Sequence, residues 1–372
     1  MGRIDNRAIR IGVVGAGHIA ERVHLPLLNQ LADVVVPAIC DVRLDGAQRL
    51  AQRFAIPMVY HDLLEMLQAE ELDVVDVLTP PDSHAHLATQ VLERGCHCLM
   101  EKPLAMTTGQ AEKVIRVAEK TGLALHVTHS FSYFPALRRA RALAASGALG
   151  EVVSVDIQYL TSIGGERYLE PGHWCNRMPG AIFYDITPHL VMLLLDFLGP
   201  IDDVKVMTRK VSSYSHLEAD ELRVMAATNR GLGSFYLSMN SPLTRYVVTI
   251  MGTKMGLWIN ADAQLVVKLR PVGGYKVVGS FRDAIPRGLG MASEIWQQAA
   301  GLASISARVI SGRVNYLSGH RYLIEASLRS LQGRGEYPVD PHKCLEVVRV
   351  LEAIFGQPSS ELTGQDYGTI QR

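Results

Sequence analysis

A glycine-rich turn directly after an apolar segment constrains this chain more than any other feature. The run Ile9–Val14 predicts a strand, and residues from about His18 to Leu31 predict a helix. Between them, Gly15–Ala20 has the pattern G-x-G-x-x-A. The first glycine permits a tight turn, the second lets a ligand approach the backbone, and the small Ala20 lets the helix pack closely on the strand. The sequence therefore predicts a pyrophosphate site at the helix N-terminus.

An acidic residue stands about 20 residues further on, where a dinucleotide site requires one. The run Val34–Cys40 predicts a second strand, and Asp41 follows it directly. A carboxylate there can accept hydrogen bonds from the adenosine ribose hydroxyls, which favours NAD, although it could also simply cap the next segment. Arg43 could stack on adenine, hold the 2′-phosphate of NADP, or be solvated. We expect NAD as cofactor and leave NADP possible.

Strand-like and helix-like segments alternate along the first third of the chain. This alternation predicts a doubly wound parallel sheet, an α/β Rossmann fold, over residues 1–128. Asp82 and Ser83 are candidate N-caps of one of its helices. The further expected strands are 73–78, 96–100 and 123–127, and the further expected helices are 46–54, 82–94 and 108–120.

The pattern changes after residue 128. Closely spaced strand-like runs without intervening helices predict an α+β domain with a large open, mostly antiparallel sheet over residues 129–372. Its expected strands are 152–159, 204–208, 222–227, 233–239 and 246–251, and its expected helices are 136–145, 186–198 and others from about 291 onward.

Charge and cysteine content exclude several classes of function. Lys plus Arg and Asp plus Glu both number 37, so no net charge attracts nucleic acid or an anionic membrane. The start of the chain lacks the apolar stretch of a signal peptide, and the apolar run 181–198 carries Asp185 and Asp196, which favours a buried helix over a membrane span. The five scattered cysteines indicate reduced thiols in the cytoplasm. Cys96 and Cys98 are expected to pack in a core, and no metal site is expected.

Three further motifs agree with one another. Glu101-Lys102-Pro103 follows a predicted strand, Thr79-Pro80-Pro81-Asp82-Ser83-His84 has the form Thr-Pro-x-x-x-His, and Asp185-Ile186-Thr187-Pro188-His189 has the form Asp-x-x-x-His. Together they resemble the Gfo/Idh/MocA family of NAD(P)-dependent oxidoreductases, which includes glucose–fructose oxidoreductase and inositol dehydrogenase. The resemblance covers essentially the whole chain. It implies that residues 129–372 bind substrate and form a homodimer or homotetramer.

The same resemblance implies a reaction. A hydride would pass between the nicotinamide and a secondary alcohol or ketone of a small-molecule substrate, a sugar, cyclitol or related polyol. Two other activities remain open: a redox-neutral glycosidase or lyase that works by transient oxidation, and a cofactor-binding regulator without catalysis. Retention of the three catalytic candidates argues against the regulator, because a sensor needs none of them.

The catalytic candidates are Lys102, Asp185 and His189, and general chemistry suits them. A lysine ammonium stabilises a developing alkoxide, and a histidine can accept the hydroxyl proton. Asp185 and His189 share one face if their segment is helical, and Pro188 indicates that a helix begins or bends near Asp185. Taken singly, a surface lysine and a local helix pair would explain these residues equally well. The resemblance assigns substrate polarisation to Lys102, acid–base catalysis to His189 and orientation to Asp185.

The remaining candidates follow from the same motifs. The expected cofactor-binding residues are Gly15, Ala16, Gly17, His18, Ile19, Asp41, Arg43, Thr79, Pro80, His84, Glu101 and Lys102. The candidate substrate residues are His129, Tyr133, Trp174 and Arg177, of which Trp174 could equally be core and Arg177 a surface partner. The chain departs from the family at Ser132–Pro135, where Arg-Phe-x-Pro is common, and in 178–187, which has fewer glycines. The substrate of the best-known members therefore does not carry over.

Overall fold

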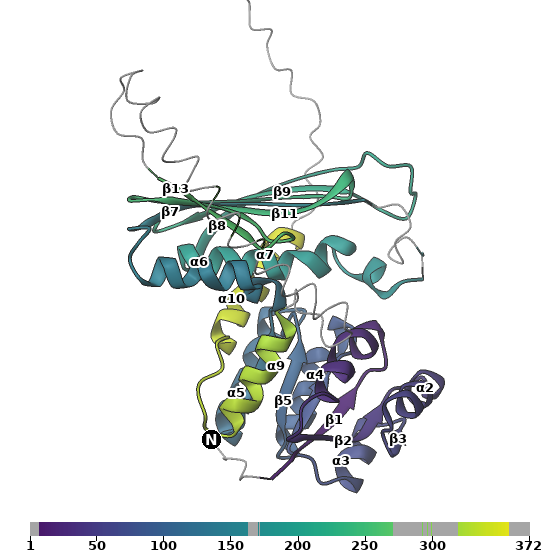
Figure 1. The fold of residues 1–372 in the computed structure, drawn as a ribbon. Helices are drawn as coiled ribbons and strands as arrows, with labels where there is room; N and C mark the ends of the chain where they lie inside the picture. Colours follow the sequence, from purple (N-terminus) through teal and green to yellow (C-terminus); the bar gives the residue numbers. More distant parts are fainter. Residues whose placement is uncertain are drawn as a thin grey trace, which may run out of the picture.

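The computed structural model describes residues 7–162, 170, 172–270 and 319–356, with the single positions 292, 296 and 299. Figure 1 shows two bodies: a parallel sheet between helices, and a broad sheet with helices along the face turned toward the first body. None of the helices in these ranges has the length and apolar character of a membrane span. All five cysteines are free and buried, and Cys96 and Cys98 pack in the core as predicted.

The first body is a six-stranded sheet in which every pair is parallel. The strand order β3-β2-β1-β4-β5-β6 is that of dinucleotide-binding doubly wound domains, so the predicted Rossmann fold is confirmed. In such sheets ligands bind at the carboxyl ends of the strands, where the order reverses between β1 and β4. The strands are β1 (Ile9–Val14), β2 (Val34–Cys40), β3 (Met58–Tyr60), β4 (Val74–Val77), β5 (His97–Glu101) and β6 (Leu125–Thr128).

Helices cover both faces of this sheet. Residues 18–28 are helical after the glycine turn and include a π-helical turn, η1 (Ala20–His24), followed by α1 (Leu25–Leu28). The others are α2 (Leu44–Phe54), α3 (Leu63–Ala69), α4 (Pro81–Glu93) and α5 (Thr108–Thr121). The predicted N-caps of α4, Asp82 and Ser83, are wrong because Pro80 occupies that position. Pro81 takes the first helical position, where its missing N–H costs no hydrogen bond.

The second body is a seven-stranded sheet in the order β13-β12-β11-β7-β10-β9-β8. Only β7 and β10 pair in parallel, so the mostly antiparallel prediction is confirmed. The helices α6 (Pro135–Ala145) and α7 (Ile182–Leu198) pack on its inner face. The strands are β7 (Val152–Ser162), β8 (Ile201–Arg209), β9 (Glu221–Thr228), β10 (Leu232–Ser238), β11 (Asn240–Gly252), β12 (Gly256–Asn260) and β13 (Leu265–Leu269).

The last two described helices return to the first body. The helix α9 (His320–Leu331) places Ile324, Leu328 and Leu331 in the apolar cluster that contains β1. The helix α10 (Pro341–Phe355) packs against both α5 and α7 (Figure 1). These helices agree with the expectation of helices late in the chain, whereas most of 291–318 lies outside the described residues. The division at residue 128 stays a prediction.

Candidate active site

The glycine turn has the shape that a pyrophosphate requires. Gly15 has φ +102°, and a Cβ there would lie 2.7 Å from the carbonyl of Leu78. Its N–H donates to the Cys40 carbonyl at 2.8 Å, which fixes the turn to β2. A Cβ on Gly17 would meet nothing within 4 Å, because this residue faces open space at the start of the helix. The turn therefore leaves room at the helix N-terminus, where free N–H groups attract phosphate. This arrangement fits a dinucleotide.

Asp41 lies beside this turn. Its carboxylate accepts hydrogen bonds from the N–H groups of Ala16 at 2.6 Å and Arg43 at 2.8 Å. These bonds hold the carboxylate at the edge where an adenosine ribose would lie. The Arg43 side chain is 78% exposed, with its Nε 4.0 Å from Asp41 Oδ1. The Arg43 side chain is therefore solvent-exposed, and it could turn toward a bound adenosine without breaking a buried contact.

His84 braces the two loops that follow β4 and β5. Its Nδ1 lies 2.6 Å from the Pro103 carbonyl, and its Nε2 lies 2.8 Å from the Thr79 carbonyl. The Thr79 hydroxyl lies 2.7 Å from that of Ser83. Burial lowers the pKa of His84, although the two carbonyls oppose this shift. The structure thus gives His84 a bracing role, and its predicted contact with the cofactor stays a prediction.

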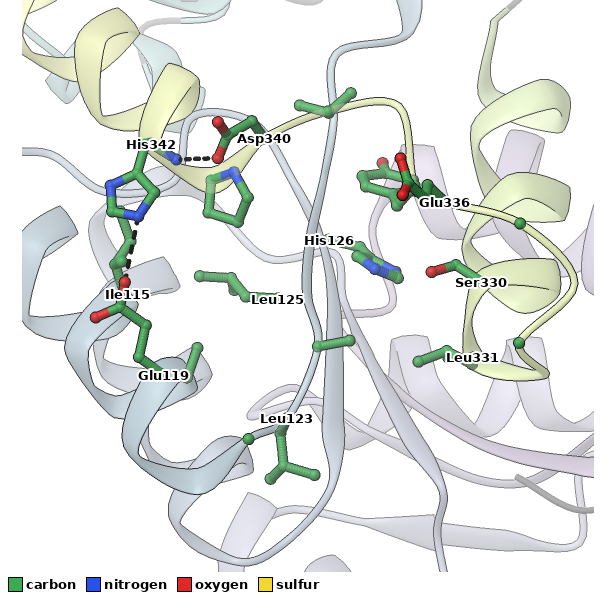
Figure 2. A pocket seen from close by; sticks show the side chains of 18 residues that line it. Ile115, Glu119, Leu123, Leu125, His126, Ser330, Leu331, Glu336, Asp340 and His342 are labelled. Atoms are coloured by element: carbon green, nitrogen blue, oxygen red, sulfur yellow. Dashed lines mark hydrogen bonds and ion pairs between the residues drawn. The ribbon is translucent and has the colours of Figure 1, made fainter. Parts of the chain in front are cut away.

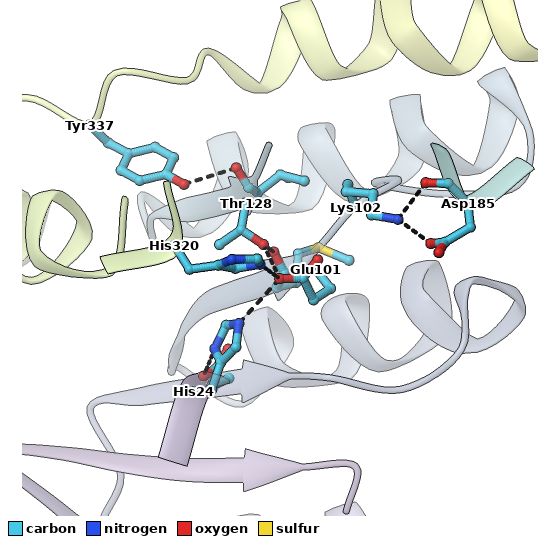
Figure 3. A network of polar contacts seen from close by, with 10 residues as sticks. His24, Glu101, Lys102, Thr128, Asp185, His320 and Tyr337 are labelled. Atoms are coloured by element: carbon cyan, nitrogen blue, oxygen red, sulfur yellow. Dashed lines mark hydrogen bonds and ion pairs between the residues drawn. The ribbon is translucent and has the colours of Figure 1, made fainter. Parts of the chain in front are cut away.

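Lys102 and Asp185 meet across the two bodies. Lys102 follows the end of β5, and Asp185 lies in the first turn of α7. The ammonium donates to the Asp185 carbonyl at 2.7 Å and forms an ion pair with Oδ1 of the same residue (Figure 3). The side chains are 9% and 18% exposed, respectively. The ion pair therefore anchors α7 to the first body in a partly desolvated place.

His189 lies one turn further along α7 and is 3% exposed. Its ring stacks on Phe131, with centroids 4.1 Å apart, and meets His129 edge-on at 6.3 Å. Its Nδ1 has no hydrogen-bond partner among the described residues. Burial, then the charge of Lys102 and the neighbouring His129, hold the pKa of His189 well below its ordinary value. The neutral ring that results can accept a proton.

The four candidate substrate residues lie in different surroundings. His129 is fully buried beside His189, and burial, reinforced by the Lys102 charge, lowers its pKa to about 3. Tyr133 instead donates its hydroxyl to the Pro338 carbonyl at 2.7 Å and stacks on Tyr322. Trp174 and Arg177 lie on a short 3-10 helix, η4 (Trp174–Arg177), which contacts α7. The geometry therefore groups His129 with the catalytic candidates and gives Tyr133 a packing role.

Sequence reasoning missed the partners of Glu101. The carboxylate lies in a buried network with Thr128, His24 and His320 (Figure 3). His24 is 77 positions and His320 is 219 positions away from Glu101. No local signal reveals a contact over such a separation. The predicted contact of Glu101 with the cofactor stays a prediction.

A cavity of about 780 Å³ lies elsewhere, between the end of α5, the start of β6 and the segment that joins α9 to α10. Figure 2 shows it lined by apolar side chains such as Leu125 and Leu331 and by the polar His126, Glu119 and His342. It contains none of the predicted site residues. The catalytic candidates lie instead around the junction of β5 and α7.

Family models match both bodies. Residues 9–129 match the Gfo/Idh/MocA model described as an oxidoreductase family with an NAD-binding Rossmann fold. Residues 137–257 match the Gfo/Idh/MocA C-terminal domain. The two matches cover more than half of the chain.

Individual relatives agree with these models. D-glucoside 3-dehydrogenase of Escherichia coli is 33% identical over 193 residues, which cover 51% of this chain and 54% of the relative. The dTDP-3,4-didehydro-2,6-dideoxy-alpha-D-glucose 3-reductase of Actinomadura kijaniata is 33% identical over 184 residues, 46% of this chain and 55% of the relative. The matches thus span about half the length of these relatives. The WlbA dehydrogenase of Bordetella pertussis, solved with NADH and UDP-GlcNAcA, has the same fold, with TM-score 0.77 at 20% identity over 95% of this chain and 96% of that one.

Proposed function

The chain belongs to the Gfo/Idh/MocA oxidoreductase family, and on that premise we propose that it transfers a hydride between NAD and a secondary alcohol or ketone of a sugar or related polyol. One observation carries the proposal. Lys102 follows β5, at the same carboxyl edge of the sheet as the dinucleotide turn after β1 but separated from it by β4, and is held by Asp185, with His189 one turn away on the same helix. An ammonium, a neutral imidazole and a carboxylate at one junction are the groups that alcohol oxidation needs.

The residues would divide the work as follows. The Lys102 ammonium stabilises negative charge on the substrate oxygen as the O–H proton leaves. His189 accepts that proton, and the growing alkoxide nearby favours the imidazolium that forms. Asp185 holds the ammonium by its carboxylate and carbonyl, and Phe131 fixes the plane of the imidazole. When bound, the nicotinamide supplies the hydride acceptor. In the reductive direction the same groups work in reverse.

We propose NAD rather than NADP as the physiological cofactor. The Asp41 carboxylate lies next to the glycine turn, where it would accept hydrogen bonds from the adenosine ribose hydroxyls and repel a 2′-phosphate. Arg43 is the feature that could make NADP usable.

For the substrate we propose a pyranose ring that reacts at a secondary hydroxyl. Two relatives that match the chain are named for chemistry at position 3 of a glucose-type ring, one as a dehydrogenase and one as a reductase. Both names fit the placement of an oxyanion-stabilising lysine beside a proton acceptor. Ring positions other than 3 and cyclitols belong in the same screen.

The test is a screen at 340 nm of alkyl glucosides, free aldoses, inositols and keto-sugars with each cofactor. We expect turnover with a pyranoside and NAD. Lys102→Ala should lower kcat on the order of 10²–10³-fold and leave NADH affinity nearly unchanged. Lys113→Ala is the matched control, because Lys113 is an exposed lysine on α5. Comparable turnover in Lys102→Ala would contradict the proposal, and product formation without net NADH would indicate the redox-neutral alternative.

We further propose a homodimer or homotetramer in the cytoplasm. Met207, Met225 and Leu232, exposed by 60%, 60% and 58%, lie on the outer face of the second sheet, opposite α6 and α7. Exposed apolar side chains on an open sheet face favour a partner. Light scattering of the purified protein at the monomer mass would contradict this assembly. The five free thiols support the cytoplasmic location.

A further inference from the structure

A buried polar network lies directly behind Lys102, and the proposed chemistry does not use it. Glu101 Oε1 accepts a hydrogen bond from the Thr128 hydroxyl at 2.6 Å and lies 3.1 Å from His24 Nε2 and 3.2 Å from His320 Nε2. His24 Nδ1 lies 2.7 Å from Asp76 Oδ2. All five side chains are buried, and Figure 3 shows Glu101 facing His24, His320 and Thr128. A buried polar group costs free energy when it lacks a hydrogen-bond partner, so a buried network of five such groups indicates a role.

The contacts determine where the protons are. Both ring nitrogens of His24 face carboxylate oxygens, and ionised carboxylates only accept hydrogen bonds. Burial opposes a charge on His24, but Asp76 and Glu101 outweigh it and raise the pKa of His24 to about 10. Burial likewise opposes ionisation of Glu101, yet the hydrogen bonds and charges of His24 and His320 hold its pKa well below its usual value. His24 is therefore an imidazolium between two carboxylates.

A divalent cation would be a different explanation, since one atom each of His24, Glu101 and His320 lies within 4.8 Å of the others. However, the contacts of 3.1 and 3.2 Å to Glu101 are ordinary hydrogen-bond lengths. The Thr128 hydroxyl also donates to the same Glu101 oxygen that a cation would need. Protons account for every contact to Glu101 Oε1, so we favour the hydrogen-bonded network.

The network connects η1, α9, β4 and β6 to the backbone that carries Lys102. Glu101 is the last residue of β5 and Lys102 is the next residue along the chain; Figure 3 shows Glu101 facing the two histidines and Lys102 facing Asp185. Glu101 is held by His24, on the π-helical turn after the glycine loop, and by His320, at the start of α9. Lys102 is held on the other side by Asp185 of α7. The position of Lys102 thus depends on both sets of contacts.

We propose that His24 and His320 are positioning residues: through hydrogen bonds to Glu101 they fix the Glu101–Lys102 backbone and so aim the Lys102 ammonium at the reacting oxygen. This inference rests on the proposed function, in which Lys102 stabilises that oxygen. It assigns a role to His24, which local sequence pattern left without one.

Amide substitutions test the proposal bond by bond. In His24→Gln an amide N–H can occupy the position of Nε2 and still donate to Glu101, whereas in His24→Asn it lies near the position of Nδ1 and can reach only Asp76. His320→Gln and His320→Asn form a second pair with the same logic, because His320 also reaches Glu101 through Nε2. His86→Asn is the control, since His86 is exposed on α4.

We expect both Asn variants to lower kcat on the order of 10²-fold, as a misplacement of about 1 Å can do. The substrate KM and the NADH dissociation constant should change only a few-fold. Both Gln variants should recover most of the lost kcat. A purely structural role would instead lower the melting temperature of the Asn and Gln variants alike, with no difference in kcat between the Asn and the Gln variants. Folded Asn variants with wild-type kcat would overturn the proposal.

A second measurement needs no substrate and separates the two proposals. Nitrogen-15 NMR of histidine-labelled wild-type protein, assigned with the His24→Gln spectrum, should show both His24 nitrogens protonated at pH 8. A His24 Nε2 that carries no proton at that pH, or stoichiometric zinc in the purified protein by elemental analysis, would overturn the network even if one variant failed to fold. Failure of the proposed function would appear differently, as a wild-type protein with a charged His24 that turns over no sugar.

Discussion

The ion pair between Lys102 and Asp185 should contribute measurably to stability as well as to chemistry. Removing one partner of a buried pair leaves the other charge uncompensated, at a cost of about 3–5 kcal/mol. Here the side chains are 9% and 18% exposed, so some solvent remains, and we take the lower end, about 3 kcal/mol. Either Asp185→Asn or Lys102→Met alone should therefore destabilise the protein by roughly this amount.

The double variant distinguishes an ion pair from two independent contacts. With both charges absent, no buried charge is left unpaired, and part of the summed loss should be recovered. We expect a coupling energy of about 2 kcal/mol between the two substitutions. At roughly 2 °C per kcal/mol, each single variant should melt about 6 °C below wild type, and the double variant should lie closer to wild type than the sum of the two losses.

Differential scanning calorimetry and urea unfolding of the cofactor-free protein measure these differences. Lys113→Met is the matched control, because Lys113 is an exposed lysine on α5. Strictly additive losses in the double variant would refute the coupling. Single variants that melt within about 1 °C of wild type would show that the two side chains do not form a desolvated pair.

Three other predictions concern the cofactor turn and the proton acceptor. The pKa of His189 lies well below 6.5 in the folded protein, so the neutral proton acceptor persists as the pH falls below that value. We therefore expect kcat/KM for oxidation to fall only below pH 6.5. An acid limb centred at or above pH 6.5 in the pH profile would contradict the assignment of His189 as the proton acceptor. Asp41→Ala should weaken NAD binding about 10-fold, through the loss of hydrogen bonds to the ribose and to the turn, and should shift the cofactor preference toward NADP. Calorimetric titration with both cofactors measures the two affinities. Unchanged affinities would contradict the ribose contact. Gly17→Val should abolish cofactor binding but keep the melting temperature within a few degrees of wild type, because a Cβ there meets nothing within 4 Å, whereas Gly15→Ala should destabilise the turn itself. NADH fluorescence titration and thermal melts check both variants. NADH binding by Gly17→Val at wild-type affinity would contradict the placement of the phosphates.

Much of the fold could be predicted because its signals are local. The glycine turn, the apolar strands and the helical spacing each lie within one short window, and the elements they predict are present. Three short strands, β3, β12 and β13, and the short helix α3 escaped prediction, because elements of three to seven residues give few positions in which a period can be seen. The N-cap of α4 was wrong because a proline at the first helical position outweighed the polar residues after it.

The site was predictable in part for the same reason. Asp185 and His189 are neighbours on one helix, so their proximity to each other follows from the sequence spacing. The ion pair that joins Lys102 to Asp185 spans 83 positions, and motif resemblance rather than periodicity indicated that they act together. Nothing comparable indicated the contact of Glu101 with His320, nor that β7 and β10 pair in parallel across a long connection. Contacts between distant segments depend on tertiary packing, which local pattern does not encode.

The return of α9 to the first sheet affects how the protein can be assembled. Ile324, Leu328 and Leu331 close the apolar cluster that contains β1, so the cofactor domain obtains one of its covering helices from the far end of the described chain. During synthesis the glycine turn leaves the ribosome early, but the surface beneath α9 stays exposed until residue 331 has been made. A fragment cut near residue 150 would keep every residue of the dinucleotide turn and still be left with bare apolar surface over β1.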